Sequence, residues 1–315
     1  MDLPMTKFCK SLTEYCSQEE TMAILEINEL LKTYGTFSLG PMDLSIEPGC
    51  ALGLVGANGA GKTTLFRSLM GTVRKDSGEV FVDGVDTNVT PAIWKQQVGY
   101  VGDYTPLFDS WDGHKNLNTF SRFYPDFSME KAAQLAQRLN LDLTKRVKTY
   151  STGQRTKFAI VLALSHSPKI LFLDEPSNGL DPVAREIFME ILFEYMESGE
   201  NSLIYATHHI SEIENLADRI VFVSSGLIVR DEIKEDLAER WRKLTFRHEL
   251  PLESIPHVLS HKSEHPFHEL ISDDAAQTMQ HLQECGVGGV EASRLSVEQI
   301  TVQILRSSAR EISHV

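Results

Sequence analysis

A glycine-rich stretch between an apolar strand and an apolar helix constrains this chain more than any other feature. The run at 51–55 predicts a buried strand, and residues 64–70 place their apolar side chains on one helical face. Between them stand Gly56, Ala57, Asn58, Gly59, Ala60, Gly61, Lys62, Thr63 and Thr64. Glycines allow backbone N–H groups to converge on a phosphate, and a helix N-terminus adds its positive dipole end. The stretch therefore predicts a phosphate-binding loop.

The spacing of this stretch fits the P-loop pattern GxxxxGK[ST]. In that pattern Lys62 reaches the β- and γ-phosphates, and the Thr63 hydroxyl binds Mg²⁺. A glycine turn that only resembles the pattern is the alternative, and the flanking strand and helix argue against it. We therefore expect a nucleotide and Mg²⁺ to bind here, and the P-loop alone does not say which nucleotide.

A second signal lies where the apolar run at 170–173 ends in Asp174 and Glu175. A carboxylate at the C-terminal end of a buried parallel strand points into the crevice where ligands bind. Asp174 is suited to hold Mg²⁺, and Glu175 is suited to polarise a water for attack on the γ-phosphate. An acidic loop after a core strand is the alternative, which the upstream P-loop disfavours.

A third signal makes the interpretation specific, because four further motifs occur in a fixed order around these two. The segment Ser151, Thr152, Gly153 and Gln154 resembles the LSGGQ signature loop of the ATP-binding cassette (ABC) family. Tyr34 resembles that family's adenine-stacking aromatic, Asp181 ends a segment similar to its D-loop, and His208 resembles its switch histidine. The resemblance covers about residues 22–235.

The resemblance implies that two cassettes face each other head to tail with ATP between them. Ser151 and the backbone at Gly153 would then contact the γ-phosphate held by the other cassette, and His208 would contact the γ-phosphate and the region around Glu175. Taken alone, Ser151 is equally explained as a helix N-cap, and a lone histidine after a strand is more often structural.

The chain departs from the family pattern at three positions. Asp103 stands where the family usually has a glutamine that touches Mg²⁺ and the membrane partner. Thr152 replaces a signature glycine, and Asn178 replaces a small or hydroxyl residue of the D-loop. An aspartate in the glutamine slot is similar to some cassettes that serve export-type membrane subunits. Asp103 is therefore included as a candidate Mg²⁺ ligand.

Composition narrows the partners of this chain of 315 residues. The formal net charge of −14 argues against nucleic acid, whose phosphates require clustered Lys and Arg. The four cysteines show no metal-binding spacing and suggest a reducing compartment. No run approaches the roughly 18 apolar residues that span a membrane. A transport pore would therefore belong to another polypeptide, with this chain peripheral on the cytoplasmic face of the membrane.

Alternating strands and helices predict an α/β fold with a mostly parallel sheet, and residues at about 105–150 turn helical. The resemblance implies a P-loop NTPase cassette, with an antiparallel β subdomain and with the helical segment as a subdomain. We expect an N-terminal extension over 1–21, the ATPase domain over 22–240 and a small C-terminal α+β domain over 241–315. In the last of these, His257, His261 and His265 recur at every fourth residue. Flanking prolines favour a solvated loop there over a helical metal site.

The motifs together predict an ATP hydrolase that powers a separate multi-span transmembrane subunit, working as a dimer of two cassettes and most simply a homodimer. A soluble cassette ATPase that switches a non-membrane partner is the alternative. It is disfavoured because the chain has one cassette, no heptad run and an acidic balance.

Overall fold

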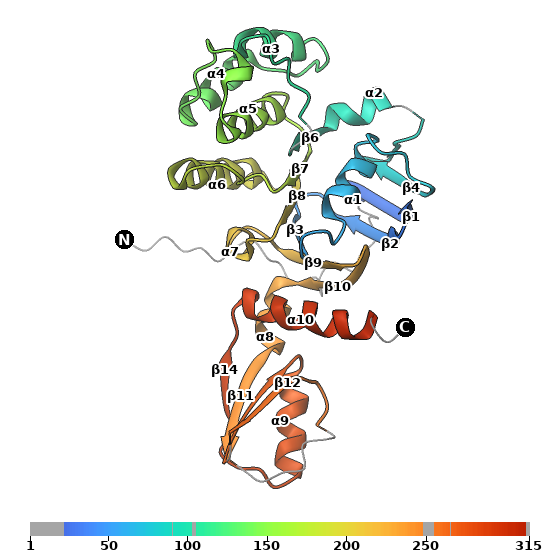
Figure 1. Ribbon diagram of the computed structural model, residues 1–315, viewed down its shortest axis with the longest axis vertical. Helices are drawn as coiled ribbons and strands as arrows, with labels where there is room; N and C mark the ends of the chain where they lie inside the picture. Colours follow the sequence, from blue (N-terminus) through green and yellow to red (C-terminus); the bar gives the residue numbers. More distant parts are fainter. Residues whose placement is uncertain (1–21, 90, 103–104, 248–254, 265, 313–315) are drawn as a thin grey trace.

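The computed structural model describes residues 22–89, 91–102, 105–247, 255–264 and 266–312 (Figure 1), with backbone only for 309–312. The predicted extension over 1–21, Asp103 and His265 lie outside the described residues.

A six-stranded sheet in the order β10-β9-β3-β8-β7-β6 forms the centre of the molecule. Its strands are β3 (Ala51–Val55), β6 (Val98–Val101), β7 (Ile170–Asp174), β8 (Ser202–Thr207), β9 (Arg219–Ser224) and β10 (Leu227–Ile233). The sheet is parallel from β9 through β3, β8 and β7 to β6, whereas β10 pairs antiparallel with β9. The predicted strands at 51–55 and 170–174 are confirmed, and the α/β fold class is confirmed with them.

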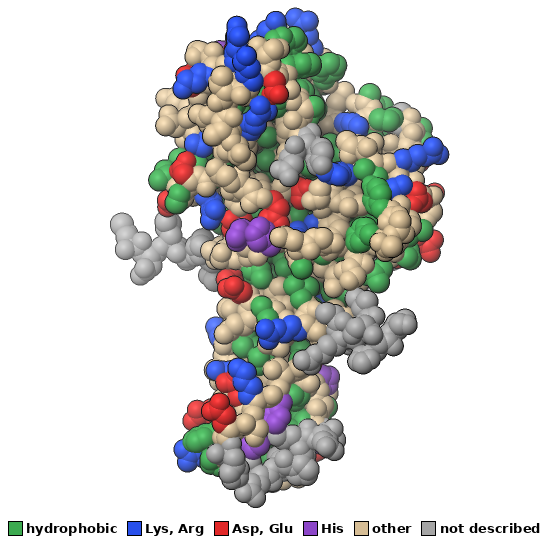
Figure 2. All heavy atoms as spheres, viewed as in Figure 1, with side chains coloured by type: hydrophobic (Ala, Val, Ile, Leu, Met, Phe, Trp, Pro, Cys, Tyr) green, Lys and Arg blue, Asp and Glu red, His purple; other side chains and the backbone are tan. Residues whose placement is uncertain are grey.

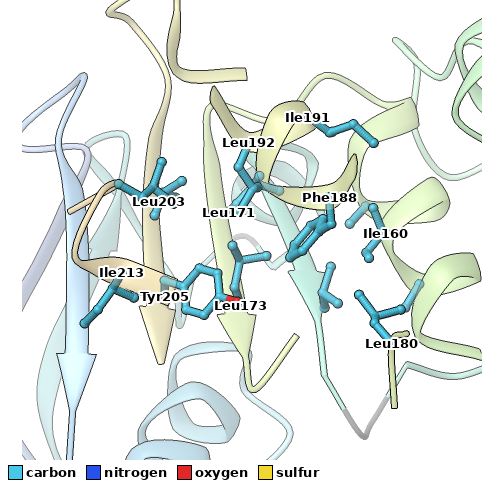
Figure 3. Close-up of a cluster of buried hydrophobic side chains, with 14 of the residues drawn as sticks. Ile160, Leu171, Leu173, Leu180, Phe188, Ile191, Leu192, Leu203, Tyr205 and Ile213 are labelled. Atoms are coloured by element: carbon cyan, nitrogen blue, oxygen red, sulfur yellow. The ribbon is translucent and has the colours of Figure 1, made fainter. Parts of the chain in front are cut away.

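Helices and a second sheet cover the two faces of this central sheet, as its continuous apolar strands require. In β7, Leu171 and Leu173 enter one buried cluster while Ile170 and Phe172 enter the other. The first cluster is shared with α5 (Thr152–Ser165), α6 (Pro182–Met196) and α7 (Ile210–Ile213), and Figure 3 shows its side chains between these helices and the sheet. The second is shared with α1 (Lys62–Leu69) and the antiparallel sheet.

The antiparallel sheet has the order β2-β1-β4-β5. Its strands are β1 (Leu25–Tyr34), β2 (Phe37–Ile46), β4 (Ser77–Val82) and β5 (Val85–Asp86). Val82 pairs with Val85 across a two-residue turn, in which Asp83 and Gly84 both have positive φ. This is the two-residue hairpin turn that an Asp-Gly pair favours.

A helical lobe, made of α3 (Gly113–Phe120), α4 (Met129–Arg138) and α5, stands at the upper end of the molecule in Figure 1. Ser128 caps α4 by accepting a hydrogen bond from the backbone N–H of Lys131, as serine commonly does at a helix start. Two short helices complete the cassette, α2 (Pro91–Trp94) before β6 and α8 (Lys234–Arg240) after β10.

The C-terminal strands form a third sheet in the order β12-β13-β11-β14. They are β11 (Arg242–Arg247), β12 (Val258–Glu264), β13 (Phe267–Ser272) and β14 (Glu291–Arg294), with α9 (Ala275–Glu284) sharing a small separate core. His257 lies in an exposed turn, as the expected solvated loop predicts, but the expectation is wrong at His261, because residues 258–264 pair with β13 as strand β12. The described residues gather no cluster of three or more histidine, cysteine, aspartate or glutamate side chains able to hold a metal.

The last helix, α10 (Val297–Ile312), returns to the cassette instead of packing in the small core. Its Ile300 and Ile304 are fully buried in the large cluster together with Ile213 and Phe222. In Figure 1 this helix lies across the narrow waist between the cassette and the C-terminal sheet. The boundary at 240 stays a prediction, and the chain beyond it contributes to two cores.

Candidate nucleotide-binding and hydrolysis site

The phosphate-binding loop connects the end of β3 to the first turn of α1. Gly61 is the N-cap residue of α1 with φ of 112°, a conformation that residues with a side chain rarely adopt. A Cβ at Gly56 would lie 2.4 Å from the carbonyl oxygen of Val223, so this position also has no room for a side chain. The glycines are therefore required by the path of the chain between strand and helix.

Lys62 and Thr63, the first residues of α1, both point toward acidic groups. The buried Lys62 ammonium donates to the carbonyl oxygen of Gly56 at 2.7 Å and lies 3.6 Å from Oε1 of Glu175. The Thr63 hydroxyl donates to Oδ1 of Asp174 at 3.2 Å. The structure thus brings the two predicted motifs, more than a hundred residues apart in sequence, to one place.

Glu175 lies between this lysine and His208. Its Oε2 is 2.8 Å from Nδ1 of His208, and its backbone N–H donates to the carbonyl oxygen of Ala206 on β8. Glu175 has φ of 50°, which is uncommon for a residue with a long side chain. Figure 2 shows histidine and acidic side chains side by side at this level of the molecule.

The predicted signature segment begins helix α5. Ser151 accepts a hydrogen bond from the backbone N–H of Gln154, and the Gln154 side chain accepts one from the backbone N–H of Ser151. This capping box shows that Ser151 is an N-cap, as the alternative interpretation expected. Ser151 and Thr152 remain exposed. Their contact with a nucleotide held by another cassette stays a prediction.

The loop after Glu175 lies against the start of α5. A Cβ at Gly153 would come within 2.1 Å of the carbonyl oxygen of Gly179, so the two backbones touch here. Asp181 ends this loop and caps α6 by accepting from the backbone N–H of Ala184, with Pro182 at the first helical position. The signature segment and the predicted D-loop are therefore neighbours.

Comparisons with known proteins agree with this geometry. The sequence model of a family described as ABC transporter matches residues 39–178. The ABC transporter ATP-binding protein NatA of Bacillus subtilis is 34% identical over 207 residues, which are 64% of this chain and 84% of NatA. The chain belongs to the ABC transporter ATP-binding proteins.

Two further similarities support the assignment. The doxorubicin resistance ATP-binding protein DrrA of Mycobacterium tuberculosis (strain H37Rv) is 30% identical over 231 residues, covering 71% of this chain and 69% of DrrA. A solved ATP-binding subunit of an ABC transporter has a TM-score of 0.63 at 24% identity, covering 69% of this chain and 92% of that one, which shows a shared fold. The ABC protein described here is accordingly an ATP hydrolase.

Tyr34, the candidate adenine-stacking residue of this ABC protein, ends strand β1. Tyr34 is 43% exposed, and the Lys32 ammonium lies 5.2 Å from the centroid of its ring. Phe37, its cross-strand partner, reaches the P-loop, since a Cβ at Gly61 would lie 3.2 Å from the Phe37 ring. The hairpin that carries Tyr34 is therefore anchored against the phosphate-binding loop.

Gly102, the residue before Asp103, lies next to Asp174 at the end of strand β7. A Cβ at Gly102 would lie 3.1 Å from Cβ of Asp174. Asp103 itself lies outside the described residues, and its role as a metal ligand stays a prediction.

Sequence analysis missed Glu212, a buried carboxylate on α7 of this ABC protein. It follows His208 by four residues and accepts hydrogen bonds from three hydroxyl groups. One glutamate in a short segment of mixed polar and apolar residues forms no periodic pattern and no motif. Only its burial and hydrogen bonds in the folded structure identify it.

Proposed function

We propose that this chain is the ATP-hydrolysing subunit that drives a separate multi-span membrane transporter from the cytoplasmic face of the membrane. The observation that carries the proposal is the convergence of Lys62, the Thr63–Asp174 pair and the Glu175–His208 pair at the C-terminal ends of two neighbouring parallel strands.

The nucleotide would lie along the P-loop, with residues 56–64 around the phosphates and Tyr34 against adenine. Two hard oxygen donors, the Thr63 hydroxyl and the Asp174 carboxylate, meet at 3.2 Å and fit Mg²⁺, which favours such ligands. Bound Mg²⁺ would neutralise charge on the phosphates. Asp103 is a further candidate ligand, and Asp103→Asn should then lower the apparent Mg²⁺ affinity of the isolated chain in a Mg²⁺ titration of ATPase activity.

Glu175 would accept a proton from the attacking water, and His208 would orient the Glu175 carboxylate and contact the γ-phosphate. Lys62 would exchange its contact with Glu175 for the phosphates when ATP binds, because a phosphate chain is the more highly charged partner.

A second copy of the chain would complete the site. Ser151 and Thr152 are exposed at the N-terminus of helix α5, and a helix N-terminus is the kind of surface that receives a phosphate. A solved relative, the ATP-binding cassette MJ0796, is described as dimeric and bound to ADP and Pi. Head-to-tail pairing would place the signature residues of one copy on the ATP of the other.

A groove between the helical lobe and α1 supports docking of a membrane partner. Its volume is about 370 Å³, and its apolar lining includes Phe66, Met70, Tyr100, Phe120, Tyr124 and Phe127. Such a groove fits a short amphipathic helix from another protein. No helix among the described residues is long and apolar enough to cross a bilayer.

Export is the direction we propose, on the basis of two similar proteins. DrrA is named for doxorubicin resistance, and the 32% identical LnrL of Bacillus subtilis is named for linearmycin resistance. Removal of a toxic compound from the cell is the simplest transport activity that confers resistance.

Purification of the full chain from detergent-solubilised membranes of its own cells tests the proposal. We expect a multi-span membrane protein to copurify, and Met70→Glu in the groove to abolish copurification while the isolated chain still hydrolyses ATP. Phe123→Glu is the matched control, because Phe123 is 67% exposed and does not line the groove. Copurification of a soluble partner alone would favour the soluble-switch alternative.

A further inference from the structure

Glu212 is a carboxylate that the fold buries beside the hydrolysis site without exposing it to nucleotide. The residue is 7% exposed and lies on α7. Its Oε2 accepts hydrogen bonds from the Ser177 hydroxyl at 2.9 Å, the Tyr205 hydroxyl at 3.0 Å and the Thr207 hydroxyl at 3.4 Å. One oxygen atom therefore joins three separate positions of the chain.

The other oxygen of Glu212 has a different environment. Oε1 lies 3.4 Å from Nε of Arg185, a partly exposed residue of α6, and accepts no hydrogen bond from the described residues. Burying a charged carboxylate costs free energy that an apolar side chain would not cost, even when hydrogen bonds and an ion pair offset part of that cost. The buried charge of Glu212 is therefore poor evidence that the residue stabilises the fold. The segments that Glu212 holds in place explain its presence better.

The hydroxyl groups on Glu212 belong to the two segments that carry the candidate base and its histidine. Ser177 follows Glu175 by two residues, and Thr207 directly precedes His208. Thr207 also accepts from the backbone N–H of His209, so its hydroxyl fixes the turn that leads out of β8. The 2.8 Å contact between Glu175 and His208 thus joins two segments that Glu212 already holds.

Tyr205 on β8 also holds the Glu212 carboxylate, through the hydrogen bond that its hydroxyl donates. Figure 3 shows its ring between Leu173 on β7 and Ile213 on α7, with the hydroxyl oxygen on the side of Leu173. Burial, and then the negative charge of Glu212, raise the pKa of this phenol, so it stays protonated and can act only as a donor to the carboxylate.

We infer that Glu212 is a positioning residue for ATP hydrolysis, which holds the Ser177 loop and the Thr207 turn so that Glu175 and His208 meet. The inference rests on the ATPase activity of the chain and is independent of the membrane partner. Glu212 itself touches neither nucleotide phosphates nor the attacking water.

This role predicts a specific kinetic signature. A displaced base impairs the step in which the proton moves, whereas Lys62 and the P-loop still bind ATP. In Glu212→Gln, whose amide group cannot accept three hydroxyls in the same way, we expect kcat of the full chain to fall by about 10- to 100-fold. The KM for ATP should change by less than about twofold, because the ground-state contacts are intact.

Two further variants connect the effect to the hydrogen bonds. Ser177→Ala should lower kcat by a smaller factor, and adding it to Glu212→Gln should cause no further loss, because both act through one network. If Glu212→Gln does not fold, Ser177→Ala and Thr207→Val each remove a single donor and should each lower kcat at unchanged KM.

Tyr195→Phe is the matched control for a lost buried hydroxyl. The Tyr195 hydroxyl on α6 donates to the carbonyl oxygens of Pro168 and Ser202, at the opposite end of β7 and β8. That variant should lower the melting temperature and keep the parent kcat. The inference is overturned if Glu212→Gln melts earlier but turns over ATP at the parent rate, or if Ser177→Ala and Thr207→Val both do so.

Discussion

Glu175 and His208 meet across the ends of two neighbouring parallel strands, with Nδ1 of the imidazole 2.8 Å from Oε2 of the carboxylate. The second carboxylate oxygen faces the Lys62 ammonium at 3.6 Å. Because Lys62 would turn to the phosphates when ATP binds, the contact with His208 is the one that would keep the carboxylate oriented, as a general base requires.

Replacing Glu175 by Gln should arrest the cycle after ATP binding. The amide keeps the shape but accepts a proton poorly, and general bases contribute about 10²–10⁴-fold to rate. The lost negative charge also removes repulsion of the γ-phosphate, so the variant should accumulate as an ATP-bound dimer in size-exclusion chromatography. Glu186→Gln, which changes an exposed carboxylate on α6, is the control. Parent-rate turnover would exclude Glu175 as the base.

Lys62→Ala should remove a buried charge from the phosphate site. We expect a loss of about 3 kcal/mol of transition-state stabilisation, as for other electrostatic donors at reacting oxygens. Steady-state ATPase kinetics measures it, with Lys169→Ala as the control, since Lys169 pairs with Asp83 on the surface. Near-normal kcat/KM would mean that the phosphates bind elsewhere.

Tyr34→Ala should weaken ATP binding more than it lowers the saturated rate. Stacking of a base on an aromatic ring contributes about 1–3 kcal/mol, and it does not change between ground state and transition state. Equilibrium binding of a fluorescent ATP analogue measures the loss, and Tyr34→Phe should retain most of the affinity. Equal affinity of the Ala variant and the parent would remove Tyr34 from the site.

Gly153→Ala should separate the signature segment from the Ser177–Asp181 loop. The new methyl group would clash with the carbonyl oxygen of Gly179 at 2.1 Å, and such overpacking costs about 1–3 kcal/mol. We expect weaker ATP-dependent dimerisation by size-exclusion chromatography and slower hydrolysis. Gly288→Ala, where the same methyl group meets no atom within 4 Å, should behave as the parent. A normal dimer in Gly153→Ala would show that the loop relaxes freely.

His166 should make the cassette less stable in acid. Burial lowers the pKa of this imidazole below its ordinary value of 6.5, so the unfolded chain binds the proton more readily than the folded chain. Its contribution to stability is therefore complete above pH 6.5 and is lost as the pH falls through the lowered value. Urea unfolding at pH 7.5 and 5.5 should show a smaller acid loss for His166→Gln than for the parent. Identical losses would contradict the assignment.

The local sequence was sufficient to predict most of the nucleotide site. The run at 51–55, the glycines of the P-loop and the apolar strand before Asp174 each act through interactions of neighbouring residues: a turn that needs glycine, a strand buried on both faces and a helix N-terminus. The same holds for the capped starts of α4 and α6, where Ser128 and Asp181 bind backbone N–H groups three residues ahead.

Features that depend on distant segments could not be predicted in the same way. Strand β12 forms because β13 supplies its hydrogen-bonding edge, although its own sequence, with His261 among polar residues, has the composition of a loop. Helix α10 was expected as part of the small C-terminal domain, but its Ile300 and Ile304 find a larger apolar surface against α7 and β9.

The sequence by itself thus determined the local geometry of the candidate nucleotide site, because each motif encodes its own backbone geometry. Only the tertiary structure decided how Glu175, the candidate base, is held. The hydroxyls of Ser177, Tyr205 and Thr207 reach one oxygen of Glu212 from separate places in the chain. The physical reason is that a buried carboxylate is satisfied by whichever donors the packed core brings within about 3 Å, and no spacing along the chain records that meeting.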